Sequence, residues 1–418
     1  MAGFVVSTNA SDGCGGLSNL GWERIPAGRR LRLTVLIAAH NEEACIGATL
    51  DSVLAQRRQP NRVVVAADNC TDRTVDIVLA HTPPDSPPVF VYRTEHNTHK
   101  KPGALNQAWA ITRARTDLFV CIDADTVLPP NALWDWEQEF LADPVLAGCS
   151  AKFTMLSSTD MVALAQAGEV PSSAAALSAH TFRERMWTRI QKAEFSKWTD
   201  TALARRGRWT SVLAGTACAI RSSALDRIVA SRIERGEEAH PWSYLSEVED
   251  FELTYRLRQM GYVCRVSATV RAYTGSMLTL KTLWAQRMKW QTGTVRDLKA
   301  IGVNRMTAID WWQQFLGLVS ALLRVSWVTL FLFGVFYTGH LQVFRYWWVF
   351  PIVFVACDVR EAWRVPHRTW ADVATAATLV PQEIFAWIRA AWFTWSWVEV
   401  LSGRTRDRWA LQIAAESR

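Results

Sequence analysis

The chain has 418 residues and a formal net charge of +7, with a pI of about 9.1. Its basic residues are dispersed or lie beside apolar segments, which argues against a nucleic-acid-binding protein. The eight cysteines are scattered without a C-x-x-C pair, so we expect a reducing compartment and no zinc site. The 22 tryptophans suggest membrane contact, because the indole ring favours membrane–water interfaces.

Residues 1–30 lack a charged start followed by a long apolar stretch, so we expect a flexible tail and no signal peptide. Beyond this tail, short apolar strands alternate with segments of helical periodicity. The expected strands cover 31–40, 61–68, 89–93 and 117–125, and the expected helices cover 42–56, 72–81 and 103–114. Such alternation predicts an α/β domain over 31–300, with a mostly parallel sheet covered by helices on both faces.

The composition becomes strongly apolar after this domain, and residues 301–418 are expected to form a membrane-associated helical region. Residues 315–337 are apolar over a length that can cross the hydrocarbon core. Residues 341–357 are a second expected span, and the Trp-rich stretch 371–401 is expected to form interfacial or re-entrant helices. A large buried helical subdomain is the alternative.

Arginines gather at 360–368 and 404–408, with fewer in 338–345. Because cytoplasmic loops carry an excess of Lys and Arg, this distribution predicts a multi-pass protein of the cell (inner) membrane. The α/β domain and the C-terminus would then face the cytoplasm.

Acidic side chains follow the expected strands at Asp68, Asp123 and Asp125. In parallel α/β sheets, ligands bind at the carboxyl ends of the strands, so we expect these side chains at one cleft. Burying carboxylates without a partner is costly. A divalent cation such as Mg²⁺ would neutralise the D-x-D pair, and Mg²⁺ binds through one or two carboxylates plus substrate phosphates. D-x-D alone is a weak signal; its place at a strand end indicates phosphate chemistry.

Two further stretches could serve a ligand or only the local structure. Asp68, in A-A-D-N-C-T-D-R-T, could face a ligand or close a turn, with Asp72 as the alternative helix cap. Lys101, in H-K-K-P-G-A-L-N-Q-A, precedes a helix start that favours anions, or it belongs to a solvated basic turn.

The helix that opens within 244–262 has four acidic residues crowding its first turn: Glu247, Glu249, Asp250 and Glu252. Acidic residues there are ordinary partners of the helix dipole, but four exceed what capping needs, so one could be a general base. In Q-R-M-K-W, Gln286 and Trp290 share a helix face. This tryptophan could belong to the core or form the floor of a sugar-binding site.

Taken together and in this order, the motifs resemble those of the family 2 glycosyltransferases of GT-A fold. The similarity is to the membrane-attached branch with the cellulose, chitin, hyaluronan and poly-N-acetylglucosamine synthases. It runs from about residue 33 to 295, through I-A-A-H-N-E-E, A-A-D-N-C-T-D-R-T, H-K-K-P-G-A-L-N-Q-A, D-A-D, A-G-T-A-C-A-I-R-S-S-A-L, E-V-E-D-F-E-L and Q-R-M-K-W. Each motif alone is weak, and the fixed order makes the resemblance specific.

The resemblance implies an inverting enzyme that transfers a hexose or N-acetylhexosamine from a UDP-sugar to an acceptor hydroxyl, with Asp250 as the base. Asp125 and Asp123 would hold Mg²⁺ or Mn²⁺. The nucleotide sugar would contact His40, Asn41, Glu42, Asp68, Lys101, Asn106, Asp123, Gln286, Arg287 and Trp290. The acceptor side would comprise Gly215, Thr216, Glu249 and Trp290.

The chain departs from the family pattern at Lys289, where arginine is usual, and Arg287 is an alternative source of that contact. The sparse membrane region leaves β-linked polysaccharide synthesis and non-processive transfer to a lipid, protein or small molecule both open. A homo-oligomer or an accessory protein could complete a channel for a polymer. A non-catalytic nucleotide-sugar-binding membrane scaffold is disfavoured, because Asp123, Asp125 and Asp250 are all present.

Overall fold

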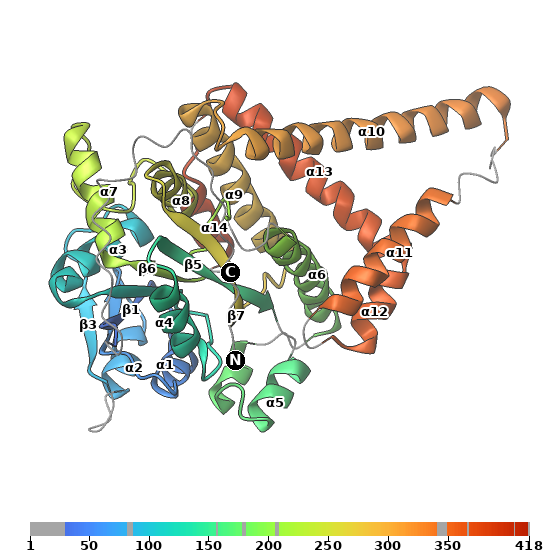
Figure 1. Cartoon of the computed structure of the whole chain (residues 1–418). Helices are drawn as coiled ribbons and strands as arrows, with labels where there is room; N and C mark the ends of the chain where they lie inside the picture. The colour runs from blue at the N-terminus through green and yellow to red at the C-terminus, as the bar shows by residue number, and fades with distance from the viewer. Residues whose placement is uncertain are drawn as a thin grey trace, which may run out of the picture.

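The computed structural model describes residues 30–81, 87–155, 158–177, 181–204, 209–340, 349–365, 368–404 and 406–416. The tail expected over 1–30 therefore lies outside the described residues, apart from residue 30. In the described part, a seven-stranded sheet with the order β3-β2-β1-β4-β6-β5-β7 forms the centre of the molecule (Figure 1).

The sheet is mixed but mostly parallel. Its strands are β1 (Leu33–Ala39), β2 (Arg62–Ala67), β3 (Val89–Arg93), β4 (Leu118–Asp123), β5 (Leu146–Met155), β6 (Ala217–Arg221) and β7 (Val263–Thr274). β1 pairs in parallel with β2 and β4, β2 with β3, and β5 with β7. β6 runs antiparallel to β4 and β5. The structure thus confirms the four strands that the sequence predicts.

The helices of this α/β part also follow the predicted order. They are α1 (Ile46–Leu54), α2 (Thr74–Ala80), α3 (Lys100–Thr112), α4 (Ala132–Ala142), α5 (Ser158–Gln166), α6 (Phe182–Ala204), α7 (Ser222–Glu234), α8 (Glu249–Gln259) and α9 (Leu280–Ile301). Two short 3₁₀ helices, η1 (Arg113–Arg115) and η2 (Ser172–Leu177), complete it. α3 begins at Lys100 rather than at 103, because a proline such as Pro102 is tolerated in the first turn of a helix.

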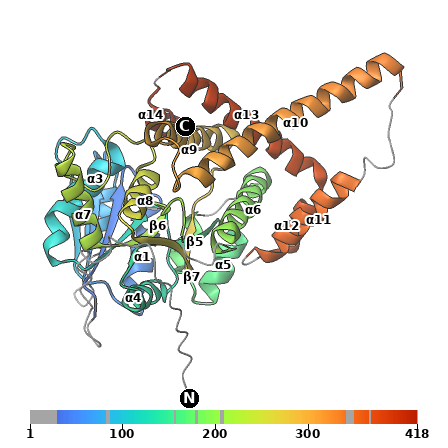
Figure 2. The same cartoon turned by 45° about the horizontal axis from the view of Figure 1, so that its top comes forward.

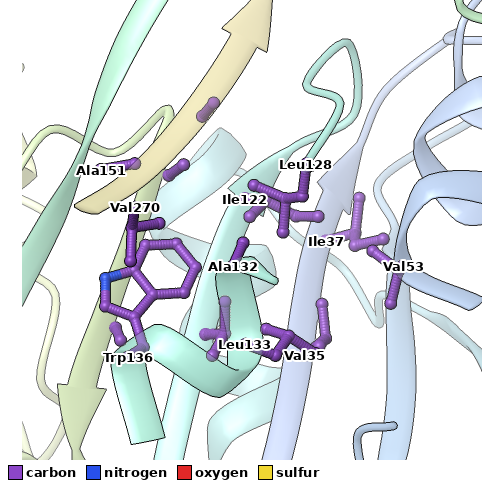
Figure 3. Packing of buried hydrophobic residues seen from close by; sticks show 14 of the residues in the cluster. Val35, Ile37, Val53, Ile122, Leu128, Ala132, Leu133, Trp136, Ala151 and Val270 are labelled. Atoms are coloured by element: carbon purple, nitrogen blue, oxygen red, sulfur yellow. The ribbon is translucent and has the colours of Figure 1, made fainter. Parts of the chain in front are cut away.

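The core lies on both faces of the sheet, which explains why the strands are continuous apolar runs rather than alternating ones. In β1, Val35 and Ile37 belong to one buried cluster, and Leu36 belongs to a second cluster on the other face. On the first face, Trp136 of α4 is fully buried next to Val270 (Figure 3). This rigid double-sided packing fixes the strand ends that carry the polar residues.

After α9 the chain forms α10 (Ala308–Thr338), α11 (Val349–Arg364), α12 (Trp370–Ala377), α13 (Leu379–Leu401) and α14 (Arg408–Glu416). α10 extends away from the sheet, and α13 diverges from α10 (Figures 1 and 2). Among the described helices, α10 alone is long and apolar enough to cross a membrane by length and composition, and 6% of its most apolar window is buried. This helix covers the span expected over 315–337.

The remaining membrane predictions are partly outside the described chain. Residues 341–348 of the span expected over 341–357 are not described, so a second span stays a prediction. The stretch 371–401 does form a pair of helices, α12 and α13. Whether this pair is interfacial or re-entrant also stays a prediction.

The last helices return to the α/β part of the molecule. α13 and α14 both pack along α9. Trp392 of α13 contacts Trp284 of α9 edge to face, with their ring centroids 6.2 Å apart. Leu283 and Met288 of α9 are fully buried in this contact region. Removing everything after α9 would therefore expose apolar core, so 301–418 is not structurally independent of 31–300.

We predict that α10 anchors the chain to membranes through its exposed apolar side chains. Leu322, Leu330 and Phe336 are 65%, 70% and 90% exposed, so changing all three to Asp should leave the fold intact. Each aspartate at the centre of a span costs roughly 2.5 to 3.5 kcal/mol. The variant should move from the sedimented membrane fraction to the supernatant.

The matched control changes three exposed apolar residues outside this helix, Ile233, Leu245 and Val303, to Asp. It should sediment with membranes as the wild type does. An α10 variant that stays with the membranes, with an unchanged unfolding temperature, would contradict the anchoring role of α10.

Candidate functional site

A cleft of about 970 Å³ opens where β1, β2 and β4 end. The described structure brings nearly all residues singled out in the sequence to this one cleft. Those that line it are His40, Asn41, Glu42, Asp68, Lys101, Asp123, Asp125, Gly215, Thr216, Glu249, Asp250, Gln286, Arg287 and Trp290.

Asn106 is the exception. It lies in α3 and is buried, and its amide forms a reciprocal pair with the backbone of Trp242: Nδ2 donates to the carbonyl at 2.8 Å and Oδ1 accepts from the N–H at 3.0 Å. The amide is thus committed to holding the segment before α8. The geometry gives no support to the prediction that Asn106 contacts a nucleotide.

Asp68 and Asp72 divide the two roles that the sequence left open. Asp72 closes the turn before α2, since its carboxylate accepts the N–H groups of Thr74 and Glu43 at 3.0 Å each. Asp68 lines the cleft, and its carboxylate accepts from the Thr94 hydroxyl at 3.0 Å. Asp68 therefore remains available to a ligand.

Two polar residues beside Asp68 are ordered by backbone groups. His40 Nδ1 lies 2.6 Å from the Asp68 carbonyl oxygen. The side-chain oxygen of Asn41 accepts the N–H of Thr71 at 2.8 Å. These contacts hold the loop after β1 against the loop after β2 and shape one end of the cleft.

An ion pair between Lys101 and Asp123 lies at the centre of the cleft. The Lys101 ammonium also donates to the Gly215 carbonyl at 3.2 Å. Burial disfavours its charge, but the carboxylates of Asp123, Glu249 and Asp250 outweigh burial and raise the pKa of Lys101 above its ordinary value. A Cβ on Gly215 would lie 3.0 Å from Lys101 Nζ, so a larger residue there would require the ammonium to shift slightly.

The D-x-D carboxylates lie beside this pair. Asp125 accepts from the Thr274 hydroxyl at 3.2 Å. Burial, and then the negative charge of Asp123, raise the pKa of Asp125 to about 6. Burial also raises the pKa of Glu42 to about 7, with the charges of Asp125 and Asp123 acting in the same direction. This surplus of carboxylates favours a cation.

The four acidic residues around the start of α8 have different partners. Glu247 pairs with Arg296, and Glu252 pairs with Arg232 at 2.6 Å. Those two are therefore engaged in ion pairs that join α8 to its neighbours. Glu249 and Asp250 line the cleft together with Lys101, and Glu247, although paired with Arg296, lies at the cleft wall as well.

Asp250 is fixed by the backbone at the helix start. Its Oδ2 accepts the N–H of Gly215 at 3.2 Å, and its Oδ1 accepts its neighbour Phe251's N–H at 2.8 Å. Burial raises the pKa of Asp250, against the effects of these N–H groups and of Lys101. A carboxylate with a raised pKa, held rigidly at a cleft wall, is suited to accept a proton.

On α9, Arg287 and Lys289 have different partners. Arg287 donates to Glu194 of α6 at 2.7 Å and lies over the Phe195 and Trp290 rings, at 4.9 and 4.6 Å from their centroids. It is thus held on the α6 side of the cleft.

Lys289 faces the acidic centre instead. Burial lowers its pKa to about 8, while Glu249 acts to raise it. Both side chains line the cleft, and Lys289, where arginine is usual in the family, is the one without a carboxylate partner at hydrogen-bond distance among the described residues.

The sequence did not indicate several residues that line the cleft. Those from α6 are Glu194, Phe195 and Trp198, and those from α14 are Trp409, Gln412, Ile413 and Glu416. The α14 residues are spaced at i, i+3, i+4 and i+7, a pattern that marks one helix face. That pattern was present in the sequence, but nothing in it says what the face touches.

For a metal ion, the described residues contain no group of three or more His, Cys, Asp or Glu side chains arranged to bind one. Asp123 and Asp125 could supply two oxygen ligands. Their environment leaves room, because Gly275 has no Cβ, and one there would lie 3.1 Å from Asp125 Oδ2. Further oxygen ligands would have to come from a substrate or from water.

Comparison with known proteins adds a family match. Residues 34–229 match the family model Glycosyl transferase family 2. The chain is 26% identical over 269 residues to "Probable glycosyltransferase YdaM" of Bacillus subtilis (strain 168), covering 63% of this chain and 55% of that protein. It is 22% identical over 261 residues to "Poly-beta-1,6-N-acetyl-D-glucosamine synthase" of Staphylococcus aureus (strain COL), covering 62% and 54%. The chain thus spans about half the length of these curated relatives.

Among solved structures, a mannosyltransferase, PcManGT from Pyrobaculum calidifontis in complex with GDP-Man and Mn²⁺, resembles the chain with a TM-score of 0.50 at 18% identity. The alignment covers 90% of this chain and 89% of that one. Together with the mixed, mostly parallel sheet, this likeness confirms the expected GT-A fold.

The carboxyl group of Asp297 in α9 gives a prediction for pH dependence. Burial raises its pKa to about 7 against a donated hydrogen bond from Ser246, with Glu252, Asp250 and Glu247 adding to the rise. The folded state therefore binds more protons than the unfolded state between about pH 4 and pH 7, and stability falls as the pH rises through this interval. Asp297→Asn should remove this loss.

The measurement is the free energy of unfolding of wild type and Asp297→Asn from pH 4 to 8. The advantage of the variant should grow by up to about 1.4 kcal/mol per pH unit within the interval and then level off. The same change at the exposed Asp76 of α2 serves as the control. An advantage that is constant with pH would show that folding does not raise the pKa of Asp297.

Proposed function

Because residues 34–229 match the family 2 glycosyltransferases, we propose that this chain is a glycosyltransferase that transfers a hexose or N-acetylhexosamine from a UDP-sugar to an acceptor hydroxyl with inversion. One observation carries this proposal. Asp250, held by two backbone N–H groups, lines the same cleft as the Lys101–Asp123 pair and Asp125.

In the proposed reaction, Asp250 accepts the proton of the acceptor hydroxyl. The acceptor oxygen forms a bond to the anomeric carbon of the donor as the bond to the diphosphate oxygen breaks, which inverts the configuration. The diphosphate leaves with the electron pair. Lys101 and Lys289 place two positive charges at the wall where this charge would develop, and fixed charges of that kind stabilise a leaving group.

The residues present fit a Mg²⁺ or Mn²⁺ ion. Asp125 and Asp123 offer oxygen ligands in an acidic surrounding that raises the pKa of Asp125, and hard divalent cations prefer such oxygens together with substrate phosphates. When bound, the ion would neutralise charge on the leaving diphosphate. The similar mannosyltransferase structure contains Mn²⁺, which supports this assignment.

Polysaccharide synthesis is the proposed use of this chemistry, because one relative is named a poly-beta-1,6-N-acetyl-D-glucosamine synthase. A UDP-sugar is proposed over a GDP-sugar on the family resemblance. The exposed apolar α10 supports a place at the cytoplasmic face of the cell membrane, in a multi-pass chain if the undescribed residues 341–348 complete a second span. A homo-oligomer or an accessory protein would then complete a polymer channel.

Non-processive transfer to a lipid, protein or small-molecule acceptor is the second candidate. The observation that favours it is the small membrane part, in which one described helix has the length and composition of a span. The size of the reaction product distinguishes the two candidates.

The first test is a donor screen. Full-length protein in detergent with Mn²⁺ or Mg²⁺ is incubated with a panel of UDP- and GDP-sugars, and nucleoside diphosphate release is measured. We expect release with a UDP-hexose or a UDP-N-acetylhexosamine and a product that grows with time. Release with no donor, together with no UDP binding, would favour a non-catalytic role.

Asp250→Asn should abolish transfer and retain the fold. Asparagine keeps one of the two hydrogen bonds from the backbone N–H groups, through its single oxygen, and it cannot take a proton, so we expect a loss of about 10²- to 10⁴-fold in turnover. UDP binding should be nearly unchanged. Asp226→Asn, on the half-exposed face of α7, is the matched control.

Asp125→Asn should weaken the binding of the divalent cation. The change removes one negative charge from the proposed metal ligands while keeping the size of the side chain, so the Mn²⁺ concentration for half-maximal UDP binding should rise at least tenfold. Calorimetric titration of Mn²⁺ with UDP present measures it. An unchanged Mn²⁺ requirement would move the metal site away from D-x-D.

A further inference from the structure

The C-terminal helix α14 forms part of the cleft wall, although its sequence lies beyond the membrane-associated helices. One face of this helix, made by Trp409, Gln412, Ile413 and Glu416, lines the same cavity as Asp123 and Asp250. Figure 2 shows α14 beside α9. An amphipathic helix placed on the surface only for solubility or for membrane contact would not direct this face at the catalytic carboxylates.

Ion pairs fix the start of α14 to three other elements. Arg408 Nε donates to Glu399 of α13 at 3.0 Å, and both side chains are at least nine-tenths buried. Glu399 also lies 3.7 Å from Arg296 of α9. Asp407, just before the helix, pairs with Lys100 at the start of α3. The position of α14 over the cleft is therefore specified by charge as well as by packing.

The same ion pairs lead to the proposed base. Arg296 binds Glu247, which lies three residues before Asp250, and its guanidinium also donates to the Arg404 carbonyl at 3.0 Å. A continuous set of contacts thus joins the segment before α8, the middle of α9 and the start of α14.

The contact that reaches into the cleft is between Trp409 and Lys289. The Lys289 ammonium lies 3.3 Å from the centroid of the Trp409 ring, and Lys289 is 6% exposed. A cation over an indole face is attracted by the ring, and the attraction is larger when the cation is desolvated.

Other charges around Lys289 would otherwise direct its ammonium elsewhere. Glu249 and Asp123 attract it, Lys101 repels it, and Glu416 attracts it from the end of α14. An ammonium that formed a close ion pair with Glu249 would no longer be available to bind an incoming anion. The Trp409 ring supplies an attractive partner that neutralises no charge, so the lysine keeps its positive charge available in the cleft.

We propose that α14 is a wall of the donor site and that Trp409 is a positioning residue, which holds the Lys289 ammonium where it meets the diphosphate of the nucleotide sugar. The inference rests on the proposed function, because that function supplies the diphosphate. It assigns a role in donor binding to a helix outside the matched domain 34–229.

The test measures UDP binding by calorimetry, with Mn²⁺ present, on the full chain in detergent. Trp409→Leu keeps an apolar side chain but removes the aromatic face, and it should weaken UDP binding about tenfold. Trp409→Phe keeps an aromatic face and should stay within about twofold of the wild type. Leu411→Ala, at an exposed position of α14 that does not line the cleft, should also stay within about twofold.

A second series guards against a folding defect in Trp409→Leu. Replacing Trp409 by tryptophans with increasing numbers of ring fluorines reduces the electron density of the ring face at nearly constant shape, so UDP affinity should fall stepwise. Equal affinity across this series, or equal weakening by Trp409→Leu, Trp409→Phe and Leu411→Ala, would overturn the inference and leave the proposed function standing. A wild-type chain that binds no UDP would overturn both.

Discussion

The whole site depends on one electrostatic constraint: carboxylates gathered at the strand ends require a positive charge among them. Lys101, at the start of α3, supplies it by pairing with Asp123, and the surrounding carboxylates raise the pKa of this lysine despite its burial. Burial, with a further contribution from neighbouring carboxylates, raises the pKa values of Asp125 and Glu42, so keeping both ionised beside a single ammonium is costly. The unbalanced negative charge is what would draw a divalent cation into the cleft.

The mixed sheet places the groups that this constraint needs. β6 runs antiparallel beside β4, so the segment before it returns to the strand end that carries D-x-D. There the N–H of Asp123 donates to the Thr216 carbonyl at 3.0 Å. Gly215, the preceding residue, holds Lys101 through its carbonyl and Asp250 through its N–H. One short turn thus joins the proposed metal side to the proposed base.

The C-terminal region has two physical roles in this structure. α10 exposes apolar side chains and is suited to a membrane, whereas α13 and α14 pack on α9 and help to enclose the cleft. Donor chemistry and membrane attachment are therefore joined through α9, which carries Lys289 and Trp290 on one side and meets Trp392 on the other. A change in the position of the C-terminal helices would therefore alter the surroundings of Lys289 directly.

The sequence by itself determined the alternation of strands and helices, the D-x-D position and the one cleft, because apolar periodicity and strand-end polarity are local properties. It could not show that Asn106 binds the Trp242 backbone, that Glu194 holds Arg287, or that the Lys289 ammonium lies over the Trp409 ring. Each of these contacts joins two residues that lie far apart in the sequence. Only tertiary packing decides which charged or polar group meets which, since several partners in the chain have the same chemistry.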